Sequence, residues 1–243
     1  GPRTLAELRH LLAETRERGW ADEVEDVTAG LRSVGAAVFD HSGHPVAALS
    51  TTWRRHLALP EPGTVGHRLP RGPDGRYNLG LSEWRDIEDA VRLALARGAR
   101  EIVLVGWSMG GAIVLQFLDR SPLASDVSRA VLDCPVVDWG DVLRHHAALH
   151  RVPAPVGHLG SALMGQHWAK RLVGVSESVD VARTNWVKRA DELSHPMLLI
   201  HSRDDEFVPV GPSEALAAAR PDLVTFEPWS LARHCKEWNV DPR

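Results

Sequence analysis

The stretch Ile102-Val103-Leu104-Val105-Gly106-Trp107-Ser108-Met109-Gly110-Gly111 decides the fold. Its apolar start predicts a buried strand, a G-x-S-x-G pattern follows, and residues 109–118 then favour a helix. In such a strand–turn–helix unit the serine is held in strained dihedral angles, and small residues two before and two after it avoid a clash. The pattern predicts Ser108 as a nucleophile. The alternative is a glycine-rich turn whose serine only caps the helix.

The two neighbours of Ser108 have expected roles of their own. The N-terminus of the following helix directs free N–H groups and the positive end of the helix dipole at the place where an oxyanion develops. The N–H of Met109 is therefore expected to donate to that oxyanion. Trp107, on the other side of the serine, is assigned to substrate binding.

Candidate partners for Ser108 follow later strands. Met197–His201 predicts a strand, and Asp204, Asp205 and Glu206 come shortly after it, where open α/β sheets place functional groups. The alternative is that all three are solvated loop carboxylates. His234 lies beyond the last predicted strand and takes the third place in the chain order Ser, Asp, His.

Other titratable residues are given structural roles. His195 and His201 flank a strand and are expected to pack, while most other histidines fall in an irregular stretch. No His/Cys/Asp group has the sequence spacing of a zinc site, so no metal is expected. The Ser-His-Asp chemistry needs no cofactor. Two cysteines, Cys134 and Cys235, form no disulfide framework and fit a reducing compartment.

The order of predicted elements indicates the architecture. Helices and short apolar strands alternate after residue 77, which predicts an α/β fold: a mostly parallel sheet with helices on both faces. Residues 4–18 predict a helix, and residues 34–39 and 45–50 predict two short strands. A Pro- and Gly-rich stretch separates the two parts. We therefore expect a small α+β segment over 1–56, a junction over 57–76 and a catalytic core over 77–243.

Residues 139–194 are predicted to form a helical lid over the core. They are irregular, partly helical and contain Trp139, Trp168 and Trp186. These tryptophans line an apolar pocket or fill the interior of the lid, and at least one is expected to do the latter. A lid would set the choice of substrate through its shape.

Charge and hydropathy exclude several function classes. The net charge of −4 gives no broad attraction for nucleic acid or anionic lipid, and no apolar run approaches the ~18 residues of a membrane span. The sequence shows no recognition helix, which disfavours a DNA-binding regulator. A cytoplasmic protein without nucleic-acid or membrane partners is expected.

At the quoted motifs the chain resembles the α/β-hydrolase superfamily, over about residues 71–243. It is similar to bacterial esterase-like and prolyl-oligopeptidase-like members. Besides the turn around Ser108, the matching segments are residues 75–80, 132–135, 201–209 and 232–234. The family's H-G-x-x-D-x-x-V-P frame places its acid on Asp205, so the resemblance implies Asp205 rather than Asp204. Ser202 stands where the frame has its glycine.

The N-terminal part resembles a different family. The hydrolase hairpin and the H-G loop that supplies a second oxyanion donor belong upstream of residue 71, and we find no such element there. Residues 1–56 instead resemble the end of the effector-binding domain of IclR-type regulators, through residues 16–21, 30–34, 37–40 and 45–50. An alternative takes residues 35–44 as a hydrolase strand ending in a D-x-x-G-H-like loop. In both cases the chain resembles a chimera of two partial domains.

These observations predict a serine hydrolase that cleaves a carboxyl ester or related small acyl substrate through an acyl-enzyme. The alternative is a catalytically weak or inactive hydrolase-like fusion that binds a small molecule or a partner. Loss of one oxyanion donor lowers turnover by ~10²–10³. If the upstream strands are missing, one edge of the strand at 101–105 is bare, and a bare apolar edge favours a homodimer.

Overall fold

A parallel four-stranded sheet forms the centre of the larger part of the chain. The computed structural model describes residues 2–26, 29–39, 45–54, 78–96, 98–168 and 179–240. The chain divides into two compact units, Gly1–Arg71 and Gly72–Arg243. Among the described residues no helix has the length and apolarity to cross a bilayer.

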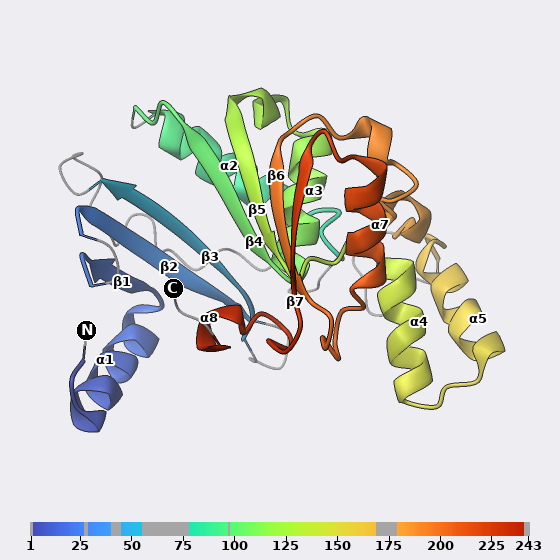
Figure 1. Cartoon of the computed structure of the whole chain (residues 1–243), viewed down its shortest axis with the longest axis horizontal. Coiled ribbons are helices and arrows are strands. Elements are labelled where there is room, and N and C mark those ends of the chain that lie inside the picture. Colours follow the sequence, from blue (N-terminus) through green and yellow to red (C-terminus); the bar gives the residue numbers. More distant parts are fainter. Residues whose placement is uncertain are drawn as a thin grey trace. The chain divides into compact units, whose positions relative to one another are not determined.

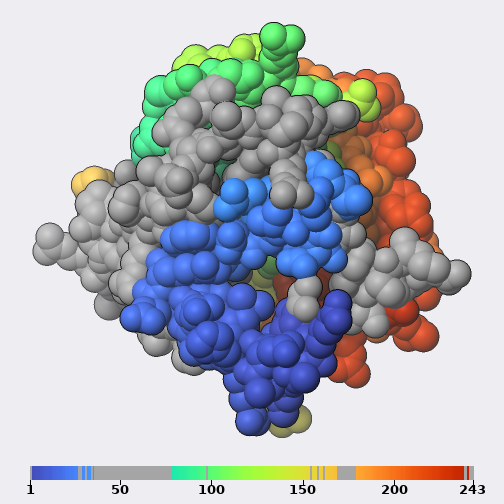
Figure 2. Space-filling view, turned by 90° about the vertical axis from the view of Figure 1, so that its left-hand side faces the viewer, coloured from blue at the N-terminus to red at the C-terminus, as the bar shows by residue number. Residues whose placement is uncertain are grey.

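The first unit contains one helix and an antiparallel sheet. Helix α1 (Leu5–Arg18) begins at Thr4, which forms a reciprocal capping box with Glu7, and ends at Gly19 in the left-handed conformation. Strands β1 (Ala21–Val24), β2 (Leu31–Phe39) and β3 (Pro45–Arg54) follow in the order β1-β2-β3 (Figure 1). No residue of α1 is buried, and Figure 2 shows this helix on the surface in dark blue.

The sheet of the second unit is built from four parallel strands. They are β4 (Ile102–Trp107), β5 (Val127–Asp133), β6 (Met197–Ser202) and β7 (Val224–Trp229), in that spatial order. Parallel strands need crossover connections, and here the crossovers carry the helices. The predicted α/β class with a mostly parallel sheet is confirmed, and the strands themselves begin or end a few residues from the predicted limits.

The helices of the second unit cover this sheet. α2 (Trp84–Ala96) packs on α3 (Met109–Arg120), α3 packs on β4 and β5, and α7 (Gly211–Ala219) packs on β6 and β7 (Figure 1). Short 3₁₀ segments η2 (Pro122–Asp126), η3 (Val181–Thr184) and η4 (Ala190–Glu192) join the elements, and α8 (Glu237–Val240) is the last helix of the described chain.

The main core lies between the sheet and these helices. Its fully buried large side chains include Phe117 and Leu115 of α3, Leu132 of β5, Leu199 of β6 and Leu216 of α7. Burial of each such side chain contributes about 1.5–3 kcal/mol. The carboxyl ends of all four strands lie at one edge of the sheet, which is where the predicted functional residues follow them.

The predicted lid divides into two parts. Helices α4 (Trp139–Leu149) and α5 (Ala154–Met164) occupy its first half and pack on one another. The end of the predicted lid is different, because Trp186 is 1% exposed and lies in the main core with Ala190 and Leu193. The end of the predicted lid therefore belongs to the core, and a lid formed by the α4–α5 region stays a prediction. Trp168 is 73% exposed, so these tryptophans do not share one role.

Candidate active site

The turn between β4 and α3 holds Ser108 in a strained conformation. Its φ is 53° and its ψ is −119°, a left-handed backbone that non-glycine residues seldom adopt. The side chain makes no capping hydrogen bond to the helix. The alternative of a serine that merely caps α3 is therefore not what the geometry shows. The strain instead holds Oγ clear of the helix end.

Two glycines make this turn possible, although not the pair that sequence analysis gives. A Cβ at Gly106 would lie 2.7 Å from the carbonyl oxygen of Gly110, and a Cβ at Gly111 would lie 2.5 Å from Cβ of Pro135. A Cβ at Gly110 would meet nothing within 4 Å. Gly106, two residues before the serine, must be small, as predicted. The second position that must be small is Gly111, three residues after the serine, and not Gly110.

The imidazole of His234 joins Ser108 to an acid. Nε2 of His234 lies 2.9 Å from Oγ of Ser108, and Nδ1 lies 2.7 Å from Oδ2 of Asp205. His234 comes from the segment between β7 and α8, and Asp205 comes from the loop after β6. The structure thus brings together the three residues that sequence analysis assigns to catalysis, at the carboxyl edge of the sheet.

Asp205 and Asp204, two of the three candidate acids, have different surroundings. Oδ1 of Asp205 accepts hydrogen bonds from the backbone N–H groups of Phe207 (2.8 Å) and Val208 (2.9 Å), while Oδ2 faces His234. Oδ1 of Asp204 accepts from Oγ of Ser202 (2.5 Å) and from the N–H of Arg233 (2.8 Å). Asp204 therefore binds the backbone of Arg233, the residue that precedes His234.

The surroundings of Asp205 and His234 shift the pKa values of both side chains. Burial favours the neutral form of Asp205, but hydrogen bonds from His201, His234 and the N–H of Val208 outweigh it and hold the pKa of this carboxyl well below its usual range. Burial likewise favours a neutral His234, yet the hydrogen bond to Asp205 outweighs it and raises the pKa of the imidazole to about 9. Asp205 is thus a fixed negative charge that stabilises an imidazolium.

His201 is a functional neighbour that sequence analysis treats as a packing residue. It is fully buried, and its Nε2 lies 3.0 Å from the carbonyl oxygen of Val208 and 3.3 Å from Oδ2 of Asp205. Both atoms are acceptors, so the proton belongs on Nε2, and Nδ1 accepts from Oγ of Ser213 at 2.8 Å. The signal in the sequence was its place four residues before Asp205.

Both cysteines of the chain also lie at this site. Sγ of Cys235 is 3.8 Å from Nε2 of His234, and the N–H of Cys235 donates to Sγ of Cys134 at 3.3 Å. Sγ of Cys134 donates to Oε1 of Glu237 at 3.4 Å. The interaction with Cys235, together with burial, raises the pKa of the Cys134 thiol. The sequence carries no signal for this neighbourhood, because the two cysteines are far apart in the chain.

The remaining predicted residues lie beside Ser108. Met109 opens α3, and the first N–H groups of a helix have no intrahelical acceptor. Trp107 is the last residue of β4 and is half-buried. The segment that would carry a second oxyanion donor in a hydrolase belongs upstream, and residues 55–77 lie outside the described residues.

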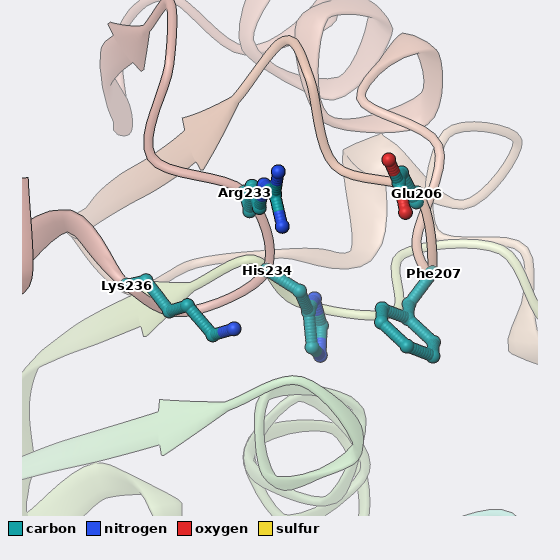
Figure 3. A pocket seen from close by; sticks show the side chains of 5 residues that line it. All are labelled: Glu206, Phe207, Arg233, His234 and Lys236. Carbon is teal, nitrogen blue, oxygen red and sulfur yellow. The ribbon is translucent and has the colours of Figure 1, made fainter.

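A pocket lies next to the imidazole. It is lined by Glu206, Phe207, Arg233, His234 and Lys236 (Figure 3). His234 lies between Phe207 and Lys236, whose side chain extends toward the imidazole. The ring of Phe207 is 5.5 Å from that of His234 and is 58% exposed. The pocket thus offers one apolar face together with charges of both signs.

Comparisons with protein families match two parts of the chain. Residues 39–151 match the family described as alpha/beta hydrolase fold, and residues 1–57 match the bacterial transcriptional regulator IclR C-terminal family. Both predicted resemblances are confirmed. The hydrolase match begins upstream of the expected residue 71 and includes residues 40–44, which belong to the segment that the alternative interpretation assigns to the hydrolase. Residues 40–44 lie outside the described residues. No curated protein sequence matches the chain.

Solved hydrolase structures resemble the chain at low sequence identity. An esterase of Pyrococcus furiosus is 14% identical, with a TM-score of 0.51 over 94% of this chain and 90% of that one. The esterase RhEst1 of Rhodococcus is 16% identical, with a TM-score of 0.46 over 92% and 94%. A puromycin-hydrolyzing peptidase of Mycobacterium tuberculosis is 17% identical, with a TM-score of 0.46 over 65% of this chain, which spans only 23% of that protein. The family match and the structural likeness to the Pyrococcus esterase show an α/β-hydrolase-like fold.

Proposed function

We propose that this α/β hydrolase is a serine hydrolase that cleaves a carboxyl ester or a related small acyl substrate. The observation that carries the proposal is the continuous hydrogen-bonded line from Oγ of Ser108 through His234 to Asp205, with distances of 2.9 and 2.7 Å. Both distances are within the range that nucleophile, base and orienting acid need.

The reaction proceeds by two acyl transfers. Nε2 of His234 takes the proton of Ser108 while Oγ forms a bond to the substrate carbonyl carbon, and the same proton is then given to the leaving alcohol as its bond to the acyl group breaks. Water, activated by His234, releases the acyl group from Ser108. Asp205 holds the proton on Nδ1 and stabilises the imidazolium that forms in both steps.

The oxyanion is stabilised from the start of α3. The N–H of Met109 donates to the developing negative charge, and the positive end of the helix dipole adds to this effect. Removal of one such donor in hydrolases costs about 10²–10³ in turnover. A second donor from the segment before residue 77 would raise the rate by a similar factor.

The pocket next to His234 suggests how the substrate is held. The exposed ring of Phe207 provides an apolar face within reach of the reacting atoms, and Trp107 is proposed to contact the acyl group from the side of β4. Replacing Phe207 by Ala keeps the backbone N–H that binds Asp205. It should therefore raise KM several-fold and change kcat little.

The experiment is reaction of the folded protein with a fluorophosphonate, followed by peptide mass analysis. A single adduct on Ser108 that is absent from Ser108→Ala supports the proposal. Hydrolysis of short p-nitrophenyl esters, measured on wild type and His234→Ala, gives the turnover.

We place the enzyme in the cytoplasm, where two free thiols remain reduced.

The match of residues 1–57 to a regulator family favours a second candidate, a fusion that binds a small molecule or a partner without turnover. Ester hydrolysis that depends on His234 would exclude it.

A homodimer through β4, the end strand of the described four-stranded sheet, also stays a proposal that sedimentation equilibrium would test.

A further inference from the structure

We propose that Cys134, Cys235 and His234 form a binding site for Zn²⁺, and that Zn²⁺ bound there blocks hydrolysis. One sulfur of each cysteine and one nitrogen of the imidazole all lie within 4.8 Å of one another. Two thiolates and an imidazole are ligands that Zn²⁺ prefers, and three protein ligands leave a fourth position for water or a hydroxyl.

The distances fit a tetrahedral zinc site after small side-chain movements. Zn–S bonds of about 2.3 Å and Zn–N bonds of about 2.05 Å give tetrahedral edges of about 3.8 Å between sulfurs and about 3.6 Å between sulfur and nitrogen. Sγ of Cys235 already lies 3.8 Å from Nε2 of His234. No backbone rearrangement is needed to close this edge.

The acid that orients His234 for catalysis also prepares it as a metal ligand. Asp205 binds Nδ1 at 2.7 Å and keeps the proton on that atom, so the neutral ring has a lone pair on Nε2. A carboxylate on the far nitrogen is the usual outer partner of a zinc-bound histidine, because it fixes the tautomer and increases the basicity of the ligand.

The two thiols are positioned with strained backbone. Cys134 has a φ of 44° and Cys235 a φ of 51°, and Arg233 and Ser108 also have positive φ values. Together these are four of the seven non-glycine residues with positive φ in the described part of the chain. Such strain gathers at functional positions. The proposed catalytic mechanism explains it at Ser108 but uses neither cysteine.

The ligands must lose their protons when Zn²⁺ binds. Zn²⁺ displaces one proton from each thiol and, at pH values below the raised pKa of His234, one proton from Nε2 of the imidazolium. The proton of Cys134 leaves from its hydrogen bond to Oε1 of the buried Glu237 and is released to solvent. Cys235 is partly exposed and loses its proton to solvent. No oxidant or reductant takes part.

Zinc at this site would stop the proposed reaction directly. Nε2 of His234 is the atom that faces Oγ of Ser108, and a metal-bound Nε2 cannot take a proton. This part of the inference depends on the proposed serine mechanism. Metal binding itself does not, because Ser108 is not one of the three protein ligands.

The test is titration of the protein with Cd²⁺ and Zn²⁺ in a non-thiol reductant. Cd²⁺ should give a thiolate charge-transfer band that saturates at one equivalent, in wild type and in Ser108→Ala alike. Any such band must come from these residues, since the chain has only two cysteines. Cys235→Ser should weaken Zn²⁺ binding by more than about a hundredfold, because loss of an outer-shell partner alone costs about 10–100-fold.

The matched control is His146→Ala, which removes a histidine of α4 that bonds the carbonyl oxygen of Phe207. It should bind both metals as wild type does. Alkylation of the partly exposed Cys235 in folded wild type should remove the band even if Cys235→Ser fails to fold. Absence of the band in wild type, or an equal band after the loss of Cys235, would overturn the site.

Inhibition is measured separately, on ester hydrolysis. Zn²⁺ should lower the wild-type rate at least tenfold, and EDTA should restore it. Cys235→Ser should need a far higher Zn²⁺ concentration for the same fractional inhibition, measured against its own metal-free rate. Binding without inhibition would overturn the second half of the inference. If the metal-free wild type shows no hydrolysis, the proposed function fails while the Cd²⁺ result still decides the site.

Discussion

Oδ2 of Asp205 lies 2.7 Å from Nδ1 of His234 and 3.3 Å from Nε2 of the buried His201. One carboxylate oxygen therefore serves two imidazoles, while the other accepts two backbone N–H groups. With all these contacts the carboxylate cannot rotate without breaking several hydrogen bonds at once. We infer that His201 positions Asp205, and through it the base.

His201→Ala should lower kcat more than it changes KM. The substitution removes a hydrogen-bond donor to Asp205 and leaves Ser213 and the carbonyl oxygen of Val208 without their buried partner. Unsatisfied buried groups cost about 1–3 kcal/mol, so the free energy of unfolding should also fall. Steady-state kinetics and urea unfolding measure both effects. An unchanged kcat would show that His201 is only a packing residue.

Asp205→Asn and Asp204→Asn should separate the two candidate acids. An amide at 205 no longer stabilises the imidazolium, and comparable changes in triad enzymes cost about 10⁴ in kcat. An amide at 204 keeps an oxygen that can accept from Ser202 and Arg233, so kcat should fall less than about tenfold. Ester hydrolysis under saturating substrate measures the difference. The reverse order would assign the acid to Asp204.

Gly111→Ala should destabilise the protein, whereas Gly110→Ala should not. The new Cβ at position 111 would meet Cβ of Pro135 at 2.5 Å, but at position 110 it would meet open space. Overpacking of this kind costs about 1–3 kcal/mol, which lowers Tm by about 2–4 °C per kcal/mol in a chain of this size. Thermal unfolding of the pair followed by circular dichroism checks this, and equal Tm values would contradict it.

Asp86→Asn should stabilise the protein more at pH 8 than at pH 4. Burial, together with the nearby charges of Glu83 and Asp89, raises the pKa of Asp86 to about 6. Between the unfolded pKa of 3.8 and this value the unfolded chain loses its proton first, so stability falls as pH rises. Asn at position 86 does not ionise, so the variant keeps the stability that the wild type loses as the pH rises. Asp126→Asn, at an exposed position that is not among the charges acting on Asp86, is the control and should show no such pH dependence.

The strand–turn–helix unit around Ser108 could be predicted because local sequence determines it. Gly106 is fixed by the close approach of the backbone of α3, and the apolar run before it forms a strand, although the prediction that this strand is buried fails at Val103, which is exposed. Asp205 and His234 follow strand ends in a fixed chain order, so their meeting with Ser108 follows from parallel topology. The choice between Asp204 and Asp205 depended on the family frame.

Other features depend on contacts between distant segments and carry little sequence signal. Trp186 could equally line a pocket or fill a core, and only its packing against residues such as Val137 decides. Strand β1 was missed because its four residues, Ala21–Val24, include two acids and show no apolar alternation. The meeting of Cys134 with Cys235 arises from the sheet, which brings the end of β5 beside the segment after β7.

The most direct test of the central claim is the rate of fluorophosphonate labelling at Ser108 in wild type, His234→Ala and Ser108→Ala. The account predicts one adduct on Ser108 in wild type, labelling slowed by about 10⁴–10⁶-fold in His234→Ala, and none in Ser108→Ala. Labelling of Ser108→Ala as fast as wild type, or no adduct on the folded wild-type protein, would contradict it.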